Sequence, residues 1–198
     1  MGLENEYIDG QTPLDEDEIG ELKIKTISTR GELDEFEQAN IEKAIEWSLK
    51  RKYSYQDILT IEFVKEVHKR MFADVWKWAG NFRKTNKNIG VDKYIIGQEL
   101  RLLLDDCIFW IENKTFPEDE IAIRFKHRMV RIHLFPNGNG RHSRLCADIL
   151  VSHALSKPVF TWGGCNIADK GETRTRYLKA IYEADNGNIE PLLKFARS

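Results

Sequence analysis

The chain has 198 residues, of which 41% are hydrophobic and 31% are charged. This length and composition fit one folded domain and exclude a chain that is disordered or collagen-like throughout. The 30 Lys and Arg residues against 32 Asp and Glu residues give a formal net charge of −2, so the chain lacks the basic excess of a dedicated nucleic-acid-binding protein. We therefore expect no direct nucleic-acid binding.

The cysteines and the N-terminal segment bear on the compartment. Cys107, Cys146 and Cys165 are an odd number without CxxC spacing, which predicts buried thiols and not a disulfide framework. The N-terminus has no basic region followed by an apolar stretch, and no apolar run approaches the roughly 20 residues that span a bilayer. These features predict a cytoplasmic protein without a membrane partner.

The first part of the chain is acidic. Residues 4–21 hold eight Asp and Glu side chains before the first basic residue, Lys23. Such a charge run is typical of a solvated segment. We predict an acidic, weakly ordered leader over residues 1–32 and one folded domain over residues 33–198.

Hydrophobic spacing predicts a mainly α domain. A helix over about 33–51 has its apolar face at Leu33, Phe36, Ile41, Ala44, Ile45 and Leu49, and a second begins near Ile61 and stops at Gly80. Residues 81–97 mix turn formers with alternating apolar residues, which predicts one β-hairpin. Further helices are predicted over about 98–113, 118–132, 140–155, 171–183 and 189–196.

The loop before the helix at about 140 concentrates unusual residues. Asn137, Gly138, Asn139 and Gly140 directly precede an apolar helix, so backbone N–H groups can point to one place where the helix dipole favours negative charge. Arg141 and Arg144 lie three residues apart on its first turn and can face the same group. The pattern favours a nucleotide triphosphate, and an ordinary turn between two helices is the alternative that spacing alone leaves open.

His133 stands at the other end of this loop. An imidazole with an ordinary pKa of about 6.5 is neutral and basic at physiological pH, so His133 is the candidate proton acceptor beside the phosphates. A packed or capping histidine is the alternative. No HExxH is present, and His127, His133 and His142 are not spaced to share one helical face, which disfavours a metal hydrolase.

The loop resembles the signature of the Fic family, His-x-Phe-x-Asp/Glu-Gly-Asn-Gly-Arg-x-x-Arg. Seven of the eight specified positions match, and they are His133, Phe135, Gly138, Asn139, Gly140, Arg141 and Arg144. The stretch Trp78-Ala79-Gly80-Asn81-Phe82-Arg83 is similar to the family's Trp-Ala-Gly-x-x-Arg segment, and residues 177–192 are similar to its closing helix and tail. The segments TRGELDEFEQANI and HLFPNGNGR together also resemble a subfamily called mobile mystery protein B.

This resemblance implies a Fic fold with a β-hairpin flap, and transfer of AMP from ATP to a hydroxyl group of a target protein. His133 would be the general base that deprotonates the hydroxyl. The residues that would bind the nucleotide are Asn137, Gly138, Asn139, Gly140, Arg141 and Arg144 in the loop, Ile89, Gly90, Val91 and Asp92 in the flap, and Tyr177 and Asp185 in the closing helix. The target protein would dock on the hairpin at residues 84–95.

Asn137 departs from the family pattern. The Asp or Glu that usually stands there binds Mg²⁺, and a neutral amide oxygen is a poorer ligand for that cation. We expect ATP as the cofactor and a weakened Mg²⁺ site at Asn137. A kinase-like transfer, as in the Doc branch, and a catalytically weak nucleotide-binding module are the alternatives that remain open.

Regulation is suggested by one further pattern. Many Fic proteins carry an inhibitory Ser/Thr-x-x-x-Glu-Gly/Asn helix, and Ser28 to Glu32 match this spacing with Leu33 in place of the last residue. Glu32 is therefore a candidate inhibitory residue, and a helix-start glutamate is the alternative. A separate, antitoxin-like partner that supplies an inhibitory helix is the other candidate regulator.

Overall fold

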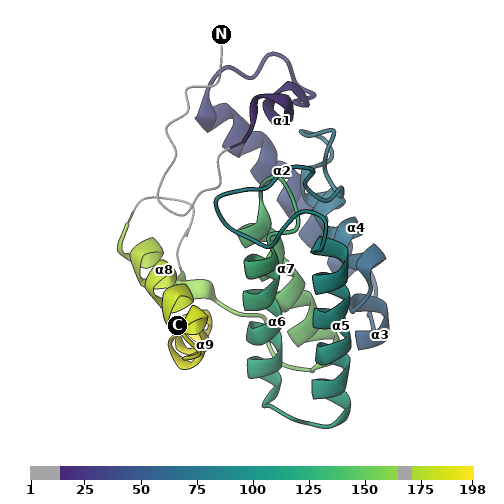
Figure 1. Ribbon diagram of the computed structural model, residues 1–198, viewed down its shortest axis with the longest axis vertical. Coiled ribbons are helices and arrows are strands. Elements are labelled where there is room, and N and C mark those ends of the chain that lie inside the picture. The colour runs from purple at the N-terminus through teal and green to yellow at the C-terminus, as the bar shows by residue number, and fades with distance from the viewer. Residues whose placement is uncertain (1–13, 165–170) are drawn as a thin grey trace.

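The computed structural model describes residues 14–164 and 171–198, which are mainly helical (Figure 1). The helices are α1 (Glu16–Gly20), α2 (Arg30–Leu49), α3 (Tyr55–Ile58), α4 (Ile61–Phe72), α5 (Ile96–Glu112), α6 (Glu118–Ile132), α7 (Asn139–Ile149), α8 (Glu172–Asp185) and α9 (Glu190–Arg197). A π-helical turn, Leu150–Ala154, continues α7, and a 3-10 turn covers Trp162–Gly164.

The helices pack around α6. This helix contacts both α5 and α7, α2 packs against α4, and α8 pairs with α9 (Figure 1). The core contains large side chains that are buried almost completely, among them Phe72, Leu100, Leu103, Phe125 and Phe135. Because α6 and α7 meet in this core, the loop that joins them rests on closely packed side chains.

The predicted helices are confirmed in their places, with two corrections. The second helix ends at Phe72 and not at Gly80, because the backbone of Val75 and Lys77 bonds residues 23 and 21 instead of continuing the helix. The inner face of α2 also differs from the prediction: Phe36, Ile45 and Leu49 are 46%, 40% and 69% exposed. The buried positions of α2 are Leu33, Glu37, Asn40, Ile41, Ala44 and Ser48.

The predicted hairpin is wrong. Residues 81–95, which we call the flap, contain turns and bends, and none of them is in a strand. Its backbone bonds elsewhere: the N–H of Arg83 donates to Leu134, and that of Val91 donates to Ile132. Within the flap, the Asn86 side chain bonds Asp92 and accepts the N–H of Lys93. The flap is therefore fixed to the end of α6 by its backbone and braced internally by side-chain bonds, without strand pairing.

The described part of the predicted leader is packed on the domain, which differs from the expectation of a weakly ordered segment; residues 1–13 lie outside the described residues. Leu22 is 6% exposed and forms an antiparallel bridge with Trp76. The N–H of Lys77 donates to the carbonyl of Glu21, and that of Lys23 donates to Val75. These bonds join residues 21–23 to the segment after α4, because the apolar side chain between the charges has a place in the core.

The described cysteines are buried thiols. Cys107 and Cys146 are free and buried, and burial raises the pKa of both thiols, whereas Cys165 lies outside the described residues. Among the described residues, every helix is too short or too polar to cross a lipid bilayer.

Candidate active site

The loop between α6 and α7 is built on two unusual backbone positions. His133 ends α6 in a left-handed conformation, with φ 58° and ψ 68°, and Gly138 begins α7 with φ 76°. A Cβ at residue 138 would lie 2.5 Å from Cζ of Phe72, so the position needs glycine for its conformation and for its space. This turn presents the N-terminus of α7 to the surface of the domain.

Side chains beneath the loop hold its backbone in place. The Asn139 amide accepts the N–H of Phe135 at 2.9 Å and donates to the carbonyl of the same residue at 2.7 Å. Nδ1 of His68 accepts the N–H of Gly80 at 3.0 Å, so the proton of the neutral ring is on Nε2, which donates to the carbonyl of Asn137 at 3.1 Å. Burial lowers the pKa of His68 well below its usual value, which keeps this ring neutral.

His133 is placed to act as a base. Its side chain lies at the edge of the loop, and the residue is only 4% exposed. Burial, and then the positive charges of Arg83 and Lys87, lower its pKa to about 4, although a hydrogen bond with the backbone of Val130 opposes this shift. The imidazole is therefore neutral at physiological pH and able to accept a proton.

Arg83 joins the flap to the loop. This arginine is 3% exposed. Its Nε donates to the carbonyl of His133 at 2.6 Å, its Nη1 donates to Thr85 at 2.8 Å, and its Nη2 bonds the carbonyl of Val91 and, at 3.4 Å, that of Ile132. One planar guanidinium thus joins the end of α6, at Ile132 and His133, to the flap.

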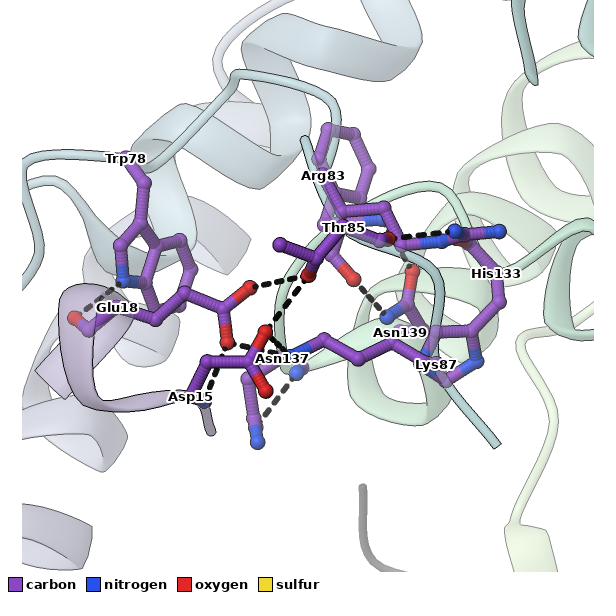
Figure 2. Close-up of polar contacts among 11 residues, drawn as sticks. Asp15, Glu18, Trp78, Arg83, Thr85, Lys87, His133, Asn137 and Asn139 are labelled. Atoms are coloured by element: carbon purple, nitrogen blue, oxygen red, sulfur yellow. Dashed lines mark hydrogen bonds and ion pairs between the residues drawn. The ribbon is translucent and has the colours of Figure 1, made fainter. Parts of the chain in front are cut away.

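The flap is also tied to α1, as Figure 2 shows. Nζ of Lys87 lies 2.9 Å from Asp15 and 2.5 Å from Glu18, and the Lys87 side chain is 4% exposed. The hydroxyl of Thr85 donates to Asp15 at 2.7 Å, and the bonds from Lys87 and Thr85 lower the pKa of Asp15. Nε1 of Trp78 donates to the carbonyl of Glu18 at 3.2 Å. The described part of the predicted leader therefore holds the flap through Lys87 and Thr85.

The two signature arginines have different partners. Nη1 of Arg141 lies 2.7 Å from Oε2 of Glu37, and its guanidinium lies 5.0 Å from the ring of Phe72. Arg144 is one turn further along α7, with its guanidinium 5.6 Å from the ring of Tyr177. Both arginines line the same cleft.

The closing helix α8 brings polar groups to the far end of this cleft. The hydroxyl of Tyr177 accepts a hydrogen bond from Nζ of the completely buried Lys126 at 2.6 Å. Asp185 pairs with Nε2 of His127 at 2.8 Å. Burial lowers the pKa of both Lys126 and His127. Tyr177 and Asp185 thus lie where the closing helix meets α6.

The cleft has a volume of about 1800 Å³ and brings most of the predicted residues together. The predicted residues that line it are Ile89, Gly90, Val91, His133, Asn137, Gly138, Asn139, Gly140, Arg141, Arg144, Tyr177 and Asp185. Gly90 lies directly against the base, because a Cβ there would be 2.6 Å from Cβ of His133. Asn139 contributes little polar surface, since its amide is bound to Phe135.

Asp92 and Glu32 lie apart from this group. Asp92 is exposed, and its carboxylate accepts the N–H of Tyr94 and the amide of Asn86 within the flap. Glu32 caps the start of α2, where its carboxylate accepts the N–H groups of Ser28 at 2.9 Å and Thr29 at 3.0 Å. These bonds lower the pKa of Glu32. An inhibitory role for Glu32 stays a prediction.

The donor set at Asn137 does not fit a protein-bound Mg²⁺. That cation prefers charged oxygen ligands. The Oδ1 of Asn137 is a neutral oxygen, and it accepts the N–H of Gly138 at 2.7 Å. Over residues 14–164 and 171–198 there is also no group of three or more His, Cys, Asp or Glu side chains that could hold a metal ion.

Sequence reasoning missed Glu37 and Lys87 as parts of the site. Glu37 follows Leu33 by four residues and precedes Ile41 by four, so it stands on the buried stripe of α2. A charged residue at a core position was the signal that could have found it. Lys87 gave no comparable signal, because its partners Asp15 and Glu18 lie some 70 residues away in the sequence.

Comparison with known proteins shows what this chain is similar to. Residues 58–151 match the model of the Fic/DOC family. The protein adenylyltransferase Fic of Aedes aegypti is 27% identical over 143 residues, and that of Drosophila grimshawi is 29% identical over 142 residues. These alignments cover 70% and 69% of this chain but only 27% and 28% of the relatives, so the chain spans about a quarter of their length.

Solved structures show the same fold. The N-terminal Fic domain of a putative cell filamentation protein from Bartonella quintana superposes with a TM-score of 0.69 at 17% identity, covering 89% of this chain and 85% of that one. BepC from Bartonella tribocorum, solved with bound AMPPNP, gives a TM-score of 0.66 at 19% identity, covering 98% and 95%. Residues 58–151 are therefore similar to a Fic/DOC family domain, and the described residues have a mainly helical Fic fold.

Proposed function

We propose that this protein is an adenylyltransferase that moves AMP from ATP to a hydroxyl side chain of another protein. The observation that carries the proposal is the placement of a neutral base, His133, in one cleft with the N-terminus of α7 and its two arginines. Relatives named protein adenylyltransferase and a Fic structure with bound AMPPNP support ATP as the substrate.

The phosphates would bind at the start of α7. Gly138 and Gly140 carry no side chain that could cover the first turn of α7, and the positive end of the helix dipole favours an anion at this point. We assign the β- and γ-phosphates to Arg141 and Arg144, whose guanidinium groups match phosphate oxygens. Mg²⁺ is proposed only as a cation carried by the phosphates of ATP, because Asn137 supplies no carboxylate.

In the chemical step, His133 takes the proton of the target hydroxyl. The hydroxyl oxygen then forms a bond to the α-phosphorus of ATP, and the bond from that phosphorus to the bridging oxygen of pyrophosphate breaks. The leaving pyrophosphate carries away the electron pair and its added charge, which the two arginines stabilise. Because burial keeps His133 neutral, the base is ready before the substrate arrives.

We further propose that the target protein docks on the flap at residues 84–95. Three apolar side chains are exposed there: Tyr94 at 84%, Ile89 at 45% and Ile95 at 39%. Docking would rely on these side chains, since the flap offers no strand edge. A separate inhibitory partner remains a proposal that a pull-down with purified protein can test.

The experiment compares ATP labelled with ³²P at the α-position and at the γ-position. Purified protein is incubated with each nucleotide, Mg²⁺ and a cell lysate, and the labelled proteins are separated on a gel. Label from the α-position alone supports AMP transfer. Label from the γ-position alone shows a kinase instead, and ATP binding without either label shows a nucleotide-binding module.

His133→Ala tests the base. We expect this variant to lose about 10²- to 10⁴-fold in transfer rate and to bind ATP nearly as tightly as the unmodified protein, because the base acts only in the chemical step. His153→Ala is the matched control, since His153 does not line the cleft. Full activity in His133→Ala would overturn the assignment.

A further inference from the structure

Glu37 is a buried carboxylate that the signature does not account for. It lies on the inner face of α2 and is 2% exposed. One oxygen, Oε1, accepts a hydrogen bond from Nε1 of Trp76 at 2.6 Å, and the other, Oε2, lies 2.7 Å from Nη1 of Arg141. A buried charge is costly unless it is paired, so this arrangement needs all three residues.

The pair with Glu37 restricts the guanidinium of Arg141. On one side the group lies 5.0 Å from the ring of Phe72, and at Nη1 it is held by Glu37. The Arg141 side chain is still 26% exposed and lines the cleft. A guanidinium carries five N–H donors, so the pair with Glu37 leaves others for a phosphate.

We propose that Glu37 is a positioning residue, which holds the guanidinium of Arg141 in the orientation that binds the terminal phosphates of ATP. This inference rests on the proposed function and adds a residue from α2, outside the segment that matches the family model. It gives α2 a part in nucleotide binding as well as in packing.

The anchoring of Glu37 favours positioning over a switch that withholds Arg141. The Glu37 side chain is 3% exposed, and moving it aside would break the bond to Trp76 inside the core. The ring of Trp76 is itself fixed, because it stacks on Trp78 with centroids 4.9 Å apart. A phosphate that enters the cleft therefore meets the guanidinium of Arg141 already paired with Glu37.

A neighbouring carboxylate does not take the same role. Asp34 lies three residues earlier on α2 and also lines the cleft, but its Oδ1 is 3.2 Å from Nε of Arg30. Burial raises the pKa of Asp34. Asp34 thus contributes charge near Arg141, whereas Glu37 alone of this pair forms an ion pair with it, at 2.7 Å.

The test measures the affinity for ATP and for AMP by calorimetry in Glu37→Gln, Trp76→Phe and the unmodified protein. Glu46→Gln is the control, because Glu46 is exposed on the same helix and does not line the cleft. Arg141 is assigned to the terminal phosphates, so its orientation should affect ATP and not AMP. Thermal unfolding of each variant shows whether α2 remains packed.

We expect Glu37→Gln to weaken ATP binding about tenfold and AMP binding less than about twofold, since a displaced guanidinium loses only its own phosphate contacts. Trp76→Phe keeps the ring and removes the donor to Glu37, so a smaller loss in the same direction is expected. This variant also serves as the test if Glu37→Gln fails to fold. kcat for AMP transfer should fall in the same order.

Three outcomes would overturn the inference. Tighter ATP binding in Glu37→Gln would show that Glu37 withholds Arg141, and equal losses for ATP and AMP would show a purely structural role. An unchanged ATP affinity in both variants would show that Arg141 needs no anchor. If the unmodified protein binds ATP but transfers no AMP, the proposed function fails while the binding comparison still tests Glu37.

Discussion

The carbonyl oxygen of His133 accepts a hydrogen bond of 2.6 Å from Nε of Arg83, and the same guanidinium bonds the carbonyl of Thr85 in the flap at 2.8 Å. The candidate base and the flap are therefore fixed by one side chain. His133 stands in a left-handed conformation, with φ 58°, which a non-glycine residue adopts only where its surroundings enforce it. The hydrogen bond from Arg83 helps to hold His133 in this conformation.

Arg83→Lys should impair the base without removing a positive charge. A lysine has a single ammonium group and cannot bond the carbonyl of His133 and the carbonyls of the flap in the same geometry. We expect a loss of about 2 kcal/mol in the free energy of unfolding, because buried carbonyls lose their donors, together with a lower kcat. Urea unfolding and steady-state kinetics measure both quantities. Arg101→Lys, at an exposed position of α5, is the control, and equal behaviour of the two variants would refute this role for Arg83.

The pH dependence of transfer should report the lowered pKa of His133. The folded-state value is about 4, so the neutral fraction stays high as the pH falls from 7.5 to 5.5. The transfer rate should decline only as the pH approaches 4, and single-turnover rates between pH 4.5 and 8 measure this. An acid limb near the ordinary histidine pKa of about 6.5 would contradict the assignment.

The lowered pKa of His133 should also make the free energy of unfolding fall as the pH is lowered. The pKa of His133 in the folded chain lies below its value of about 6.5 in the unfolded chain, so the unfolded state binds the proton more tightly. Its contribution to stability is fully present above pH 6.5 and is lost as the pH falls through 4. The buried His142 has a pKa of about 4 as well and acts in the same direction. Denaturant titrations of His133→Asn should therefore show a shallower loss of stability between pH 6.5 and 4.5 than those of the unmodified protein.

Gly138→Ala should distort the loop, whereas Gly140→Ala should be tolerated by the fold. At residue 138 a Cβ would lie 2.5 Å from Phe72 and the backbone has φ 76°, but at residue 140 nothing lies within 4 Å. We expect Gly138→Ala to lower the free energy of unfolding by about 2 kcal/mol, from strain and from the clash. Gly140→Ala, inside α7, should change it by less than about 1 kcal/mol. Chemical denaturation compares the two, and similar losses would show that the left-handed position is not the cause.

Asn137→Asp should introduce a response to Mg²⁺. The carboxylate replaces a neutral oxygen at the position where the family signature has Asp or Glu, and it adds a charged oxygen ligand beside the phosphates. We expect the Mg²⁺ concentration for half-maximal transfer to fall about tenfold, because hard cations prefer charged oxygens. Asn137→Ala is the control for the loss of the bond to Gly138. If Asn137→Asp leaves the Mg²⁺ dependence unchanged, the cation is held without residue 137.

The sequence predicted the helices and the loop well because each has a local cause. The bounds of α6 and α7 follow from Pro117 before one helix and Gly138 before the other, together with their apolar spacing. The flap was predicted wrongly as a hairpin, because its backbone donors are satisfied by Ile132 and Leu134, which are far away in the sequence. Local alternation cannot reveal partners of that kind.

Glu37 and the leader show a second limit. Acidic residues favour solvent on average, so residues such as Glu18 and Glu37 read as exposed. Both are buried here because each has specific distant partners, Lys87 for Glu18, and Arg141 with Trp76 for Glu37. Their positions depend on tertiary contacts that a pattern of hydrophobicity does not contain.

The stacked pair of Trp76 and Trp78 sets the N-terminal limit of a fragment that keeps the site whole. Nε1 of Trp76 bonds Glu37 on α2, and Nε1 of Trp78 bonds the carbonyl of Glu18 on α1. A fragment cut to residues 58–151, the part that matches the family model, would keep both indoles and lose both of their acceptors. Expression of the domain for crystallisation or screening should therefore begin upstream of α1, so that both buried indole N–H groups remain bonded.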